Sequence, residues 1–277
     1  MPHSRPTPRP PGYRYLGLRH FLRTLRIGWT FARYGLDELL ALIPLFRPYA
    51  WLSRLFPFRK RLVGDLSRGR RLRLALEELG PPFIKLGQVL STRRDVLPAD
   101  IADELNYLQD DVAPFPGDQA IAQVLASLGG QLTDHFAELD PEPVASASIA
   151  QVHRGTLASG EPVAVKVRRP GIERLIATDL AVMFAIAALA ERALAEARRL
   201  RFVAVVHEFA KTIRDELDLE KEGAHASQLR RNFRDSPILR VPRIYWHHTT
   251  REVLTLEWVA GFPIDETGAL LDADVDV

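Results

Sequence analysis

Apolar residues recur at helical spacing over much of the first 130 residues of the chain. Leu72, Leu76 and Leu79, for example, share one face of a predicted helix, which a Gly-Pro-Pro sequence ends before a second helix begins. Residues 1–12 instead combine many prolines with no apolar periodicity, a pattern typical of disorder. The pattern therefore predicts a disordered tail over residues 1–12 and a helical region over residues 13–130.

The pattern changes near Pro143, where short segments of alternating apolar and polar residues begin. Such alternation predicts strands, and a Ser-Gly turn joins the second and third strands as a hairpin. Long helical patterns separate the third strand from the fourth. The predicted fold is α+β, with helices at about 171–199 and 202–233 and strands at 143–146, 151–157, 162–168, 243–248 and 252–259.

The net charge of +2 conceals a strong asymmetry along the chain. Residues 1–73 contain 16 Lys and Arg against three Asp and Glu, a net charge of +13, and the remainder carries −11. An arginine-rich amphipathic helix with aromatic residues is suited to the headgroup region of an anionic membrane. The alternative is a helix that packs on the protein and exposes a solvated basic face. The aromatic residues concerned are Tyr13, Tyr15, Phe21, Trp29 and Phe31, interleaved with Arg14, Arg19, Arg23, Arg26 and Arg33.

The composition disfavours several classes of protein and site. The chain has no cysteine, which excludes disulfides and thiolate metal sites, and His247 and His248 have no ligand cluster around them in the sequence. No recognised nucleic-acid module accompanies the basic charge, so no nucleic-acid partner is expected. The longest apolar run, 180–190, has 11 residues, fewer than the about 18 to 20 that span a bilayer. Without a signal-peptide pattern, the expected location is the cytoplasm.

Candidate chemistry lies in two segments, ASASIAQVHRG at residues 145–155 and VAVKV at residues 163–167. Their spacing matches a glycine-rich phosphate loop followed by a lysine strand, with alanines where the glycines would stand. Each methyl group restricts φ and pushes the loop outward, so phosphates would be held differently. The nucleotide-binding candidates on this pattern are Ala145, Ala147, Ser148, Ala150, Val152 and Lys166.

Two further motifs make the pattern specific. A K-x-G-Q motif is formed by Lys85, Gly87 and Gln88, and an E-x-D motif by Glu216 and Asp218, with Glu222 following. The three motifs, in this order and spacing, resemble the UbiB (AarF/ADCK-type) family of atypical protein-kinase-like proteins, which are linked to ubiquinone biosynthesis. The resemblance extends from about residue 34 to residue 265.

The resemblance implies a kinase-like N-lobe over residues 131–261, with a five-stranded antiparallel sheet, a C helix and a helical insertion. A large helical extension precedes this lobe. As catalytic residues, Lys166 would hold the nucleotide phosphates and Glu222 would pair with it from the C helix. The segment around Glu257 and Val259 would offer backbone groups to the adenine. The implied cofactors are ATP or ADP with Mg.

The K-x-G-Q helix would fold over the nucleotide as a regulatory lid. The resemblance implies that Glu216 and Asp218 hold Lys85, while Gln88 is directed toward the nucleotide. Gly87 suggests a close helix contact, since glycine costs about 1 kcal/mol of helix propensity relative to alanine. A lid in this place argues for ATPase or small-molecule chemistry over protein phosphorylation.

Residues 262–277 contain neither the catalytic-loop motif H-R-D-x-x-x-x-N nor the D-F-G metal-binding motif of kinases. The resemblance therefore implies that the C-lobe is absent, that this segment is its truncated start, and that the chain itself holds no metal ligands. The expected function is that of a truncated UbiB-type ATPase or kinase-like protein that supports ubiquinone biosynthesis, peripheral to a bacterial inner membrane.

The expected partners are the nucleotide, an anionic membrane surface, and ubiquinone-biosynthesis proteins or a prenyl-quinone lipid. An alternative from another class is a non-catalytic N-lobe module that binds lipid or partner proteins through the basic helical region. The K-x-G-Q motif disfavours a third possibility, a different small-molecule kinase.

Overall fold

The computed structural model describes residues 17–42, 64, 66–94, 97–108 and 113–261. The predicted disordered tail and the predicted start of a C-lobe lie outside these residues. Two compact units divide the chain, a helical unit and a sheet unit. The helical unit comprises residues 1–113, 147–149 and 171–215, and the sheet unit comprises 114–146, 150–170 and 216–277.

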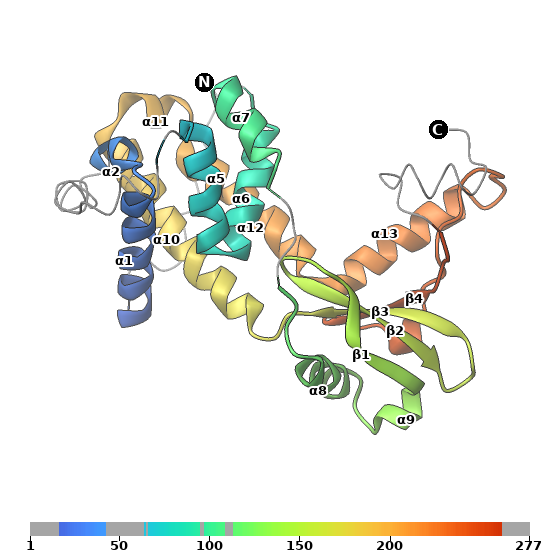
Figure 1. Ribbon diagram of the computed structural model, residues 1–277. Coiled ribbons are helices and arrows are strands. Elements are labelled where there is room, and N and C mark those ends of the chain that lie inside the picture. The colour runs from blue at the N-terminus through green and yellow to red at the C-terminus, as the bar shows by residue number, and fades with distance from the viewer. Residues whose placement is uncertain (1–16, 43–63, 65, 95–96, 109–112, 262–277) are drawn as a thin grey trace, which may run out of the picture. The chain divides into compact units, whose positions relative to one another are not determined.

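The helical unit is built from helices that come from two separate parts of the sequence (Figure 1). In the first part, Ser67 accepts a hydrogen bond from the backbone of Arg70 and so caps α5. Gly80 then adopts a positive φ and separates α5 from α6, which begins with two prolines. The helices are α1 (Leu18–Arg33), α2 (Asp37–Leu42), α5 (Arg68–Leu79), α6 (Pro81–Ser91), α7 (Ala99–Leu105), α10 (Ile172–Ala193), α11 (Ala195–Arg199) and α12 (Phe202–Glu216).

Gly87 lets α6 pack closely on its neighbours within the helical unit. A Cβ atom at this position would lie 2.3 Å from Cδ1 of Leu108 and 2.8 Å from Cδ1 of Leu76. Both leucines are buried. The packing reason expected for this glycine is therefore confirmed.

A buried ion pair joins α1 to α10. Nε and Nη2 of Arg23 lie 2.5 Å and 2.7 Å from the two carboxylate oxygens of Asp179, whose side chain is 0% exposed. Nη2 also donates to the carbonyl of Leu79 at 2.8 Å, and the guanidinium lies 5.5 Å from the ring centre of Phe83. Burial raises the pKa of Asp179, and the guanidinium of Arg23 opposes this shift. One arginine of α1 thus contacts residues of α5, α6 and α10.

The sheet unit contains four antiparallel strands in the order β1-β2-β3-β4. The first helix of the unit approaches β1 closely, because a Cβ atom at Gly117 would lie 2.1 Å from the carbonyl oxygen of Pro141. The strands are β1 (Phe136–Ser146), β2 (Ala150–Leu157), β3 (Pro162–Arg168) and β4 (Val253–Glu257), and the helices are α8 (Gly117–Leu128), α9 (Leu132–His135), α13 (Leu219–Asn232) and the short 3-10 helix η3 (Trp246–His248).

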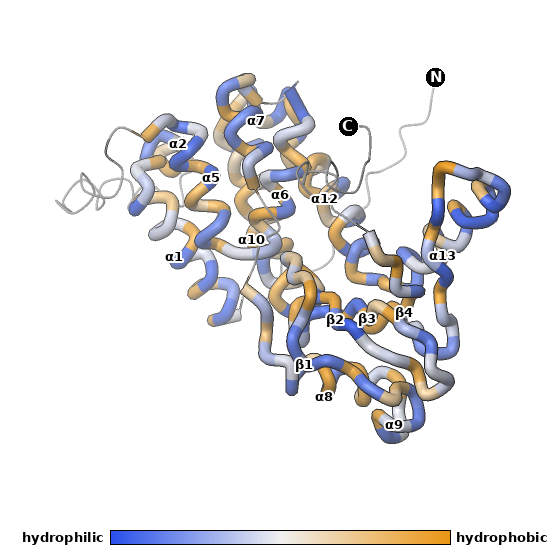
Figure 2. Tube along the Cα trace, turned by 45° about the vertical axis from the view of Figure 1, so that its right-hand side comes forward, coloured by the Kyte–Doolittle hydropathy of each residue, from blue (hydrophilic) through white to orange (hydrophobic). Residues whose placement is uncertain are grey.

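Alternation along the strands divides the sheet into two faces. Val163, Val165 and Val167 of β3 are fully buried in a core that also contains residues of α8. On the other face, Leu254 of β4 packs with Leu219 of α13. Figure 2 shows the mixture of hydrophobic and hydrophilic residues along the strands that produces this division.

Strand β1 forms one edge of the sheet and pairs irregularly with β2. Its register with β2 shifts three times between Phe136 and Ala145. The shifted stretch contains Pro141 and Pro143, and its acidic residues Glu138, Asp140 and Glu142 are exposed.

The prediction of a fifth strand at 243–248 is wrong, since the sheet formed by the described residues has four strands. Ile244 makes only an isolated bridge to Leu256. Pro242 before it has no N–H to donate. Beyond Tyr245 the chain turns into η3, where the Thr249 hydroxyl donates to the Tyr245 carbonyl and closes the turn. The backbone contacts of this segment with β4 therefore end at Tyr245, whose N–H donates to the Thr255 carbonyl.

Other predicted boundaries also change. The single helix predicted over 202–233 is two helices, α12 and α13, that are separated at Leu217 and Asp218. The break arises because Asp218 has extended backbone dihedrals and caps α13. The first strand, predicted to begin at 143, begins at Phe136.

Candidate functional site

The structure brings Lys166 and Glu222 together. Nζ of Lys166 donates to both carboxylate oxygens of Glu222, at 2.7 Å and 2.8 Å. Lys166 lies on β3 with its neighbours Val165 and Val167 on the buried opposite face, and Glu222 lies in the first turn of α13. The two side chains are 25% and 45% exposed, so the pair remains accessible to a ligand.

The position of Glu222 depends on how α13 begins. Asp218 is the N-cap residue and accepts a hydrogen bond from the backbone N–H of Lys221. Nε and Nη2 of Arg251 donate to one oxygen of Asp218, at 3.2 Å and 3.0 Å. The backbone N–H of Leu219 donates to the Arg251 carbonyl at 3.2 Å. Glu222 is therefore placed one turn after a fixed helix start.

Arg168 connects the lysine strand to the same helix start. It lies two residues after Lys166, and its Nη1 donates to the carbonyl of Leu217 at 2.8 Å. Its Nη2 lies 2.6 Å from a carboxylate oxygen of Glu252. Arg168 and Arg251 could not be predicted from the sequence, because nothing local distinguishes them from surface arginines. The cap, by contrast, could have been found from the aspartate that precedes the sequence L-E-K-E.

The alanine-rich segment forms the turn between β1 and β2. Ser146 pairs with Gln151 and Ala145 with Val152, so that Ala147, Ser148 and Ile149 connect the two strands. None of residues 145–152 has a positive φ. Alanine therefore causes no backbone strain at these positions, and the backbone itself does not require glycine.

Two other nucleotide-binding candidates share a sheet face with Lys166. Val152 lies directly opposite Lys166 in the β2–β3 register, and Ala145 lies opposite Val152 in the β1–β2 register. Directly opposed residues in antiparallel strands project to the same face. Ala150 begins β2 and pairs with Arg168. Ala145, Val152 and Lys166 thus form one row across β1, β2 and β3.

Glu257 and Val259 lie at the end of β4. The backbone N–H of Glu257 donates to the carbonyl of Arg243 at 2.8 Å. Its carboxylate accepts from the backbone N–H of Arg243 at 3.1 Å and from the guanidinium of Arg240. These contacts lower the pKa of Glu257. Val259 is exposed, and whether this segment receives an adenine stays a prediction.

The four lid candidates lie at three places in the chain: α6, the end of α12 and the cap of α13. Lys85 and Gln88 lie on α6, where Nε2 of Gln88 donates to the carbonyl of Leu108 at 3.1 Å. Glu216 is the last residue of α12, and Asp218 is the cap of α13. This hydrogen bond joins Gln88 to another residue of the helical unit. The role of these residues as a lid stays a prediction.

Within the described parts of the chain, no helix is both long and apolar enough to cross a membrane. No three or more His, Cys, Asp or Glu residues among the described positions are grouped so that they could hold a metal ion.

Comparison with known proteins identifies the relatives of the chain. It is 50% identical over 255 residues to a probable protein kinase UbiB of Marinobacter nauticus, covering 92% of this chain and 47% of that protein. A protein of the same name from Azotobacter vinelandii is 51% identical over 260 residues, covering 92% and 48% of the two chains. The chain thus spans about half the length of these curated relatives.

A solved structure, the complex of Rv3197 with erythromycin from Mycobacterium tuberculosis, is 27% identical. The match covers 69% of the present chain and 48% of the chain in the solved structure, with a TM-score of 0.48. The model of the ABC1 atypical kinase-like domain matches residues 107–277, which include the lysine strand, α13 and the end of β4. The predicted relationship is confirmed: the chain belongs to the ABC1 atypical kinase-like family, with relatives named UbiB.

Proposed function

We propose that the sheet unit binds an adenine nucleotide, as part of a UbiB-type ATPase or kinase-like protein that supports ubiquinone biosynthesis. The observation that supports this proposal is the bidentate Lys166–Glu222 pair between a central strand and a fixed helix start. A lysine held by a glutamate in this way can keep its ammonium oriented toward the phosphates of a nucleotide.

The donor set of this face suits a phosphorylated ligand. Lys166 supplies a positive charge, and the 145–150 turn supplies backbone N–H groups from alanines that carry no backbone strain. Bound ATP would supply the transferable phosphoryl group, and Mg would bind with its phosphates. Glu222 would orient Lys166 before the ligand arrives, so that little reorganisation is needed.

The other sequence candidates complete the proposal. The backbone at Glu257 and Val259 would contact the adenine, beside Val152 on the sheet face. In the helical unit, the K-x-G-Q helix with Lys85 and Gln88 would act as a lid. The proposed setting is the cytoplasmic face of a bacterial inner membrane, with ubiquinone-biosynthesis proteins or a prenyl-quinone lipid as partners.

Nucleotide binding by the 277-residue chain tests the proposal. Lys166→Ala should weaken the affinity for a fluorescent ATP analogue about tenfold, because one charged hydrogen bond to phosphate is lost. Lys211→Ala is the matched control, since Lys211 is an exposed lysine on α12. Equal affinities of both variants and the unmodified chain would exclude Lys166 from nucleotide binding.

A second candidate function, contact with an anionic membrane surface, is favoured by the exposed residues of α1. Leu18, Phe21, Leu22 and Trp29 are 72%, 57%, 54% and 46% exposed, although each is a large apolar side chain. Not all of the predicted residues belong to this surface. Phe31 packs against the buried residues Ala32 and Leu40, and Arg23 makes the buried ion pair with Asp179. The helix therefore has one packed face and one exposed apolar face with arginines beside it.

Vesicle co-sedimentation tests this second candidate. Phe21→Ser/Trp29→Ser should reduce binding to anionic vesicles about tenfold or more, because two aromatic anchors are lost. Binding by the unmodified chain should weaken with salt, since the Debye length falls from about 10 Å at 0.1 M to about 3 Å at 1 M. Tyr107→Ser removes an aromatic side chain that is 67% exposed and provides the control. No binding by the unmodified chain would leave α1 as a packed helix with a solvated basic face.

A further inference from the structure

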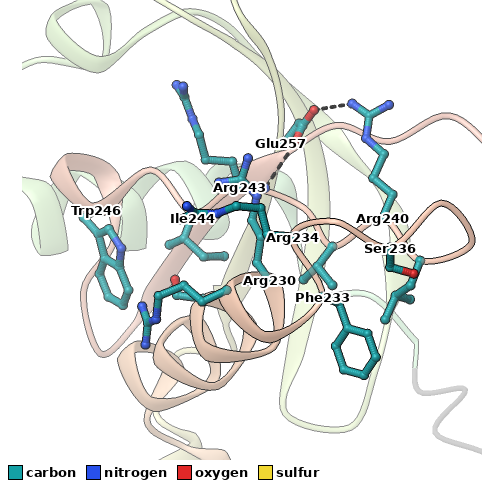
Figure 3. Close-up of a pocket in the computed structure, with 13 residues that line it drawn as sticks. Arg230, Phe233, Arg234, Ser236, Arg240, Arg243, Ile244, Trp246 and Glu257 are labelled. Atoms are coloured by element: carbon teal, nitrogen blue, oxygen red, sulfur yellow. Dashed lines mark hydrogen bonds and ion pairs between the residues drawn. The ribbon is translucent and has the colours of Figure 1, made fainter.

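An open cavity of about 930 Å³ lies in the sheet unit between the end of α13, the segment after it and the end of β4 (Figure 3). We call it the arginine cavity. Neither Lys166 nor Glu222 lines it, and Glu257 is the residue that it shares with the candidate nucleotide site. Its lining includes one carboxylate, Glu257, and five arginines, Arg230, Arg231, Arg234, Arg240 and Arg243.

The positive charge of the arginine cavity is only partly balanced. Glu257 is held by the guanidinium of Arg240 and the backbone N–H of Arg243. Arg231 donates to the neutral Gln228 at 2.6 Å. Among the described residues, the side chains of Arg230 and Arg234 have no hydrogen-bonded partner and no carboxylate within ion-pair distance, although the charge of Arg230 helps to lower the pKa of Glu257.

The positive charge of the remaining arginine, Arg243, is also only partly compensated by its neighbours. Its guanidinium lies 4.4 Å from the ring centre of Tyr245 and 3.9 Å from a carboxylate oxygen of Glu161. The five guanidinium groups are therefore opposed by Glu257 in the lining and by Glu161 outside it. Like charges gathered at one place repel each other, and a multiply charged anion would relieve that repulsion.

The helix end explains only part of this arrangement. Cations in the last turn of a helix interact favourably with its unpaired carbonyl groups, which accounts for Arg230 and Arg231 at the end of α13. Arg240 and Arg243 come from the following segment and also line the cavity, where Figure 3 shows Arg240 directed toward Glu257. Both have partners within the sheet unit, Arg240 on Glu257 and Arg243 on Tyr245 and Glu161, so the charge least compensated by the protein is that of Arg230 and Arg234.

The cavity also has an apolar wall. Phe233 and Trp246 line it and are 45% and 48% exposed, and Leu239 and Ile244 lie beside them. Its volume lies in the range of small-molecule sites, about 300 to 1,000 Å³. A guanidinium group binds phosphate with two parallel hydrogen bonds, which makes arginine the preferred residue for phosphate recognition.

We infer that the arginine cavity binds a phosphate or diphosphate ester with an apolar part next to the charged group. Arg230, Arg234 and Arg243 hold the phosphate oxygens, and Phe233 and Trp246 contact the apolar part. A soluble diphosphate ester and the headgroup of an anionic phospholipid share this chemistry.

Calorimetric titration of the 277-residue chain with inorganic pyrophosphate at constant ionic strength tests the inference. Arg230→Gln/Arg234→Gln should weaken binding at least about tenfold, because two charge-assisted contacts are lost. Arg174→Gln/Arg214→Gln removes the same charge from exposed arginines outside the cavity and should leave the affinity within about twofold. Equal losses in both double variants would show a nonspecific charge effect and overturn the inference.

Lys166→Ala separates this site from the proposed nucleotide site. Pyrophosphate binding that persists in Lys166→Ala and disappears in the cavity variant supports the arginine cavity, whether or not ATP binds at Lys166. Loss in Lys166→Ala alone would assign pyrophosphate to the nucleotide site and overturn the inference. If pyrophosphate does not bind to the unmodified chain, the inference is overturned. If hexaglutamate, an anion without phosphate, binds in place of pyrophosphate, the inference is overturned as well.

A short-chain, soluble phosphatidic acid identifies the source of the phosphate. If the phosphatidic acid binds more tightly than pyrophosphate, and if Phe233→Ser removes this difference in affinity, the site binds a lipid headgroup. Tighter binding of pyrophosphate would assign it to a soluble diphosphate ester. The substituted arginines and Phe233 are exposed, and Lys166 is 25% exposed, so equal melting temperatures of the variants should show that the fold is retained.

Discussion

Asp179→Ala should lower the free energy of unfolding of the helical unit by about 3 to 5 kcal/mol, the usual effect of removing one partner of a buried ion pair. The carboxylate of Asp179 is 0% exposed and binds Arg23 at two points. Without it, the Arg23 guanidinium would stay among α1, α5, α6 and α10 with only the Leu79 carbonyl and the Phe83 ring as described contacts. Chemical denaturation followed by circular dichroism measures the change.

An exposed pair of the same chemistry provides the control. Arg94 and Asp103 lie 2.6 Å apart with side chains 62% and 57% exposed. Asp103→Ala should cost only about 0 to 1 kcal/mol, because water already solvates both charges. Arg23→Met/Asp179→Leu should recover much of the lost stability, since apolar residues can replace a buried pair. Equal effects of Asp179→Ala and Asp103→Ala would contradict the structure of this interface.

Lys166→Ala should lower kcat for ATP hydrolysis about 10²- to 10³-fold in a protein that joins this chain to the C-lobe of a full-length relative. The reason is that Lys166 would place a charge at the phosphates, where a site shielded from water gives the charge its largest effect. Glu222→Gln should have a smaller effect in the same direction, because it orients the ammonium through both carboxylate oxygens. Steady-state phosphate release gives both values.

Two control substitutions and a comparison of kcat with KM test whether the effect is specific to Lys166. Lys211→Ala should leave kcat unchanged, and so should Glu220→Gln, which alters an exposed neighbour of Glu222 on α13. An increase in KM without a fall in kcat would show that Lys166 contributes only to uniform binding. Full turnover by Lys166→Ala would remove it from the reaction.

Local patterns predicted the parts of the structure that depend on short-range order. The hairpin of β2 and β3 follows from alternation and a Ser-Gly turn, and the helical spacing of residues 72–79 corresponds to α5. The expected pairing of Lys166 with Glu222 came from the family resemblance, because 56 residues separate the two. No local pattern could have supplied it.

The features that the sequence did not predict depend on contacts over long distances or on competing local geometry. In the sequence, nothing distinguishes Asp179 from other acidic residues in helices, because its partner Arg23 is 156 residues away. The strand expected at 243–248 alternates as a strand does, but Pro242 and the Thr249 hydroxyl end the pairing early. The arginine cavity joins a helix end to the segment after it, and each part alone has an ordinary charge pattern.

The irregular edge strand β1 has a consequence for self-association. An unpaired strand edge can recruit the edge of a second copy and start aggregation. In β1 the register shifts break the regular row of backbone groups, the prolines withhold two donors, and the exposed Glu138, Asp140 and Glu142 would repel the same residues of another copy. At the other edge, β4 is partly covered by the backbone of Arg243 and Tyr245. The sheet therefore resists edge-to-edge polymerisation on both sides.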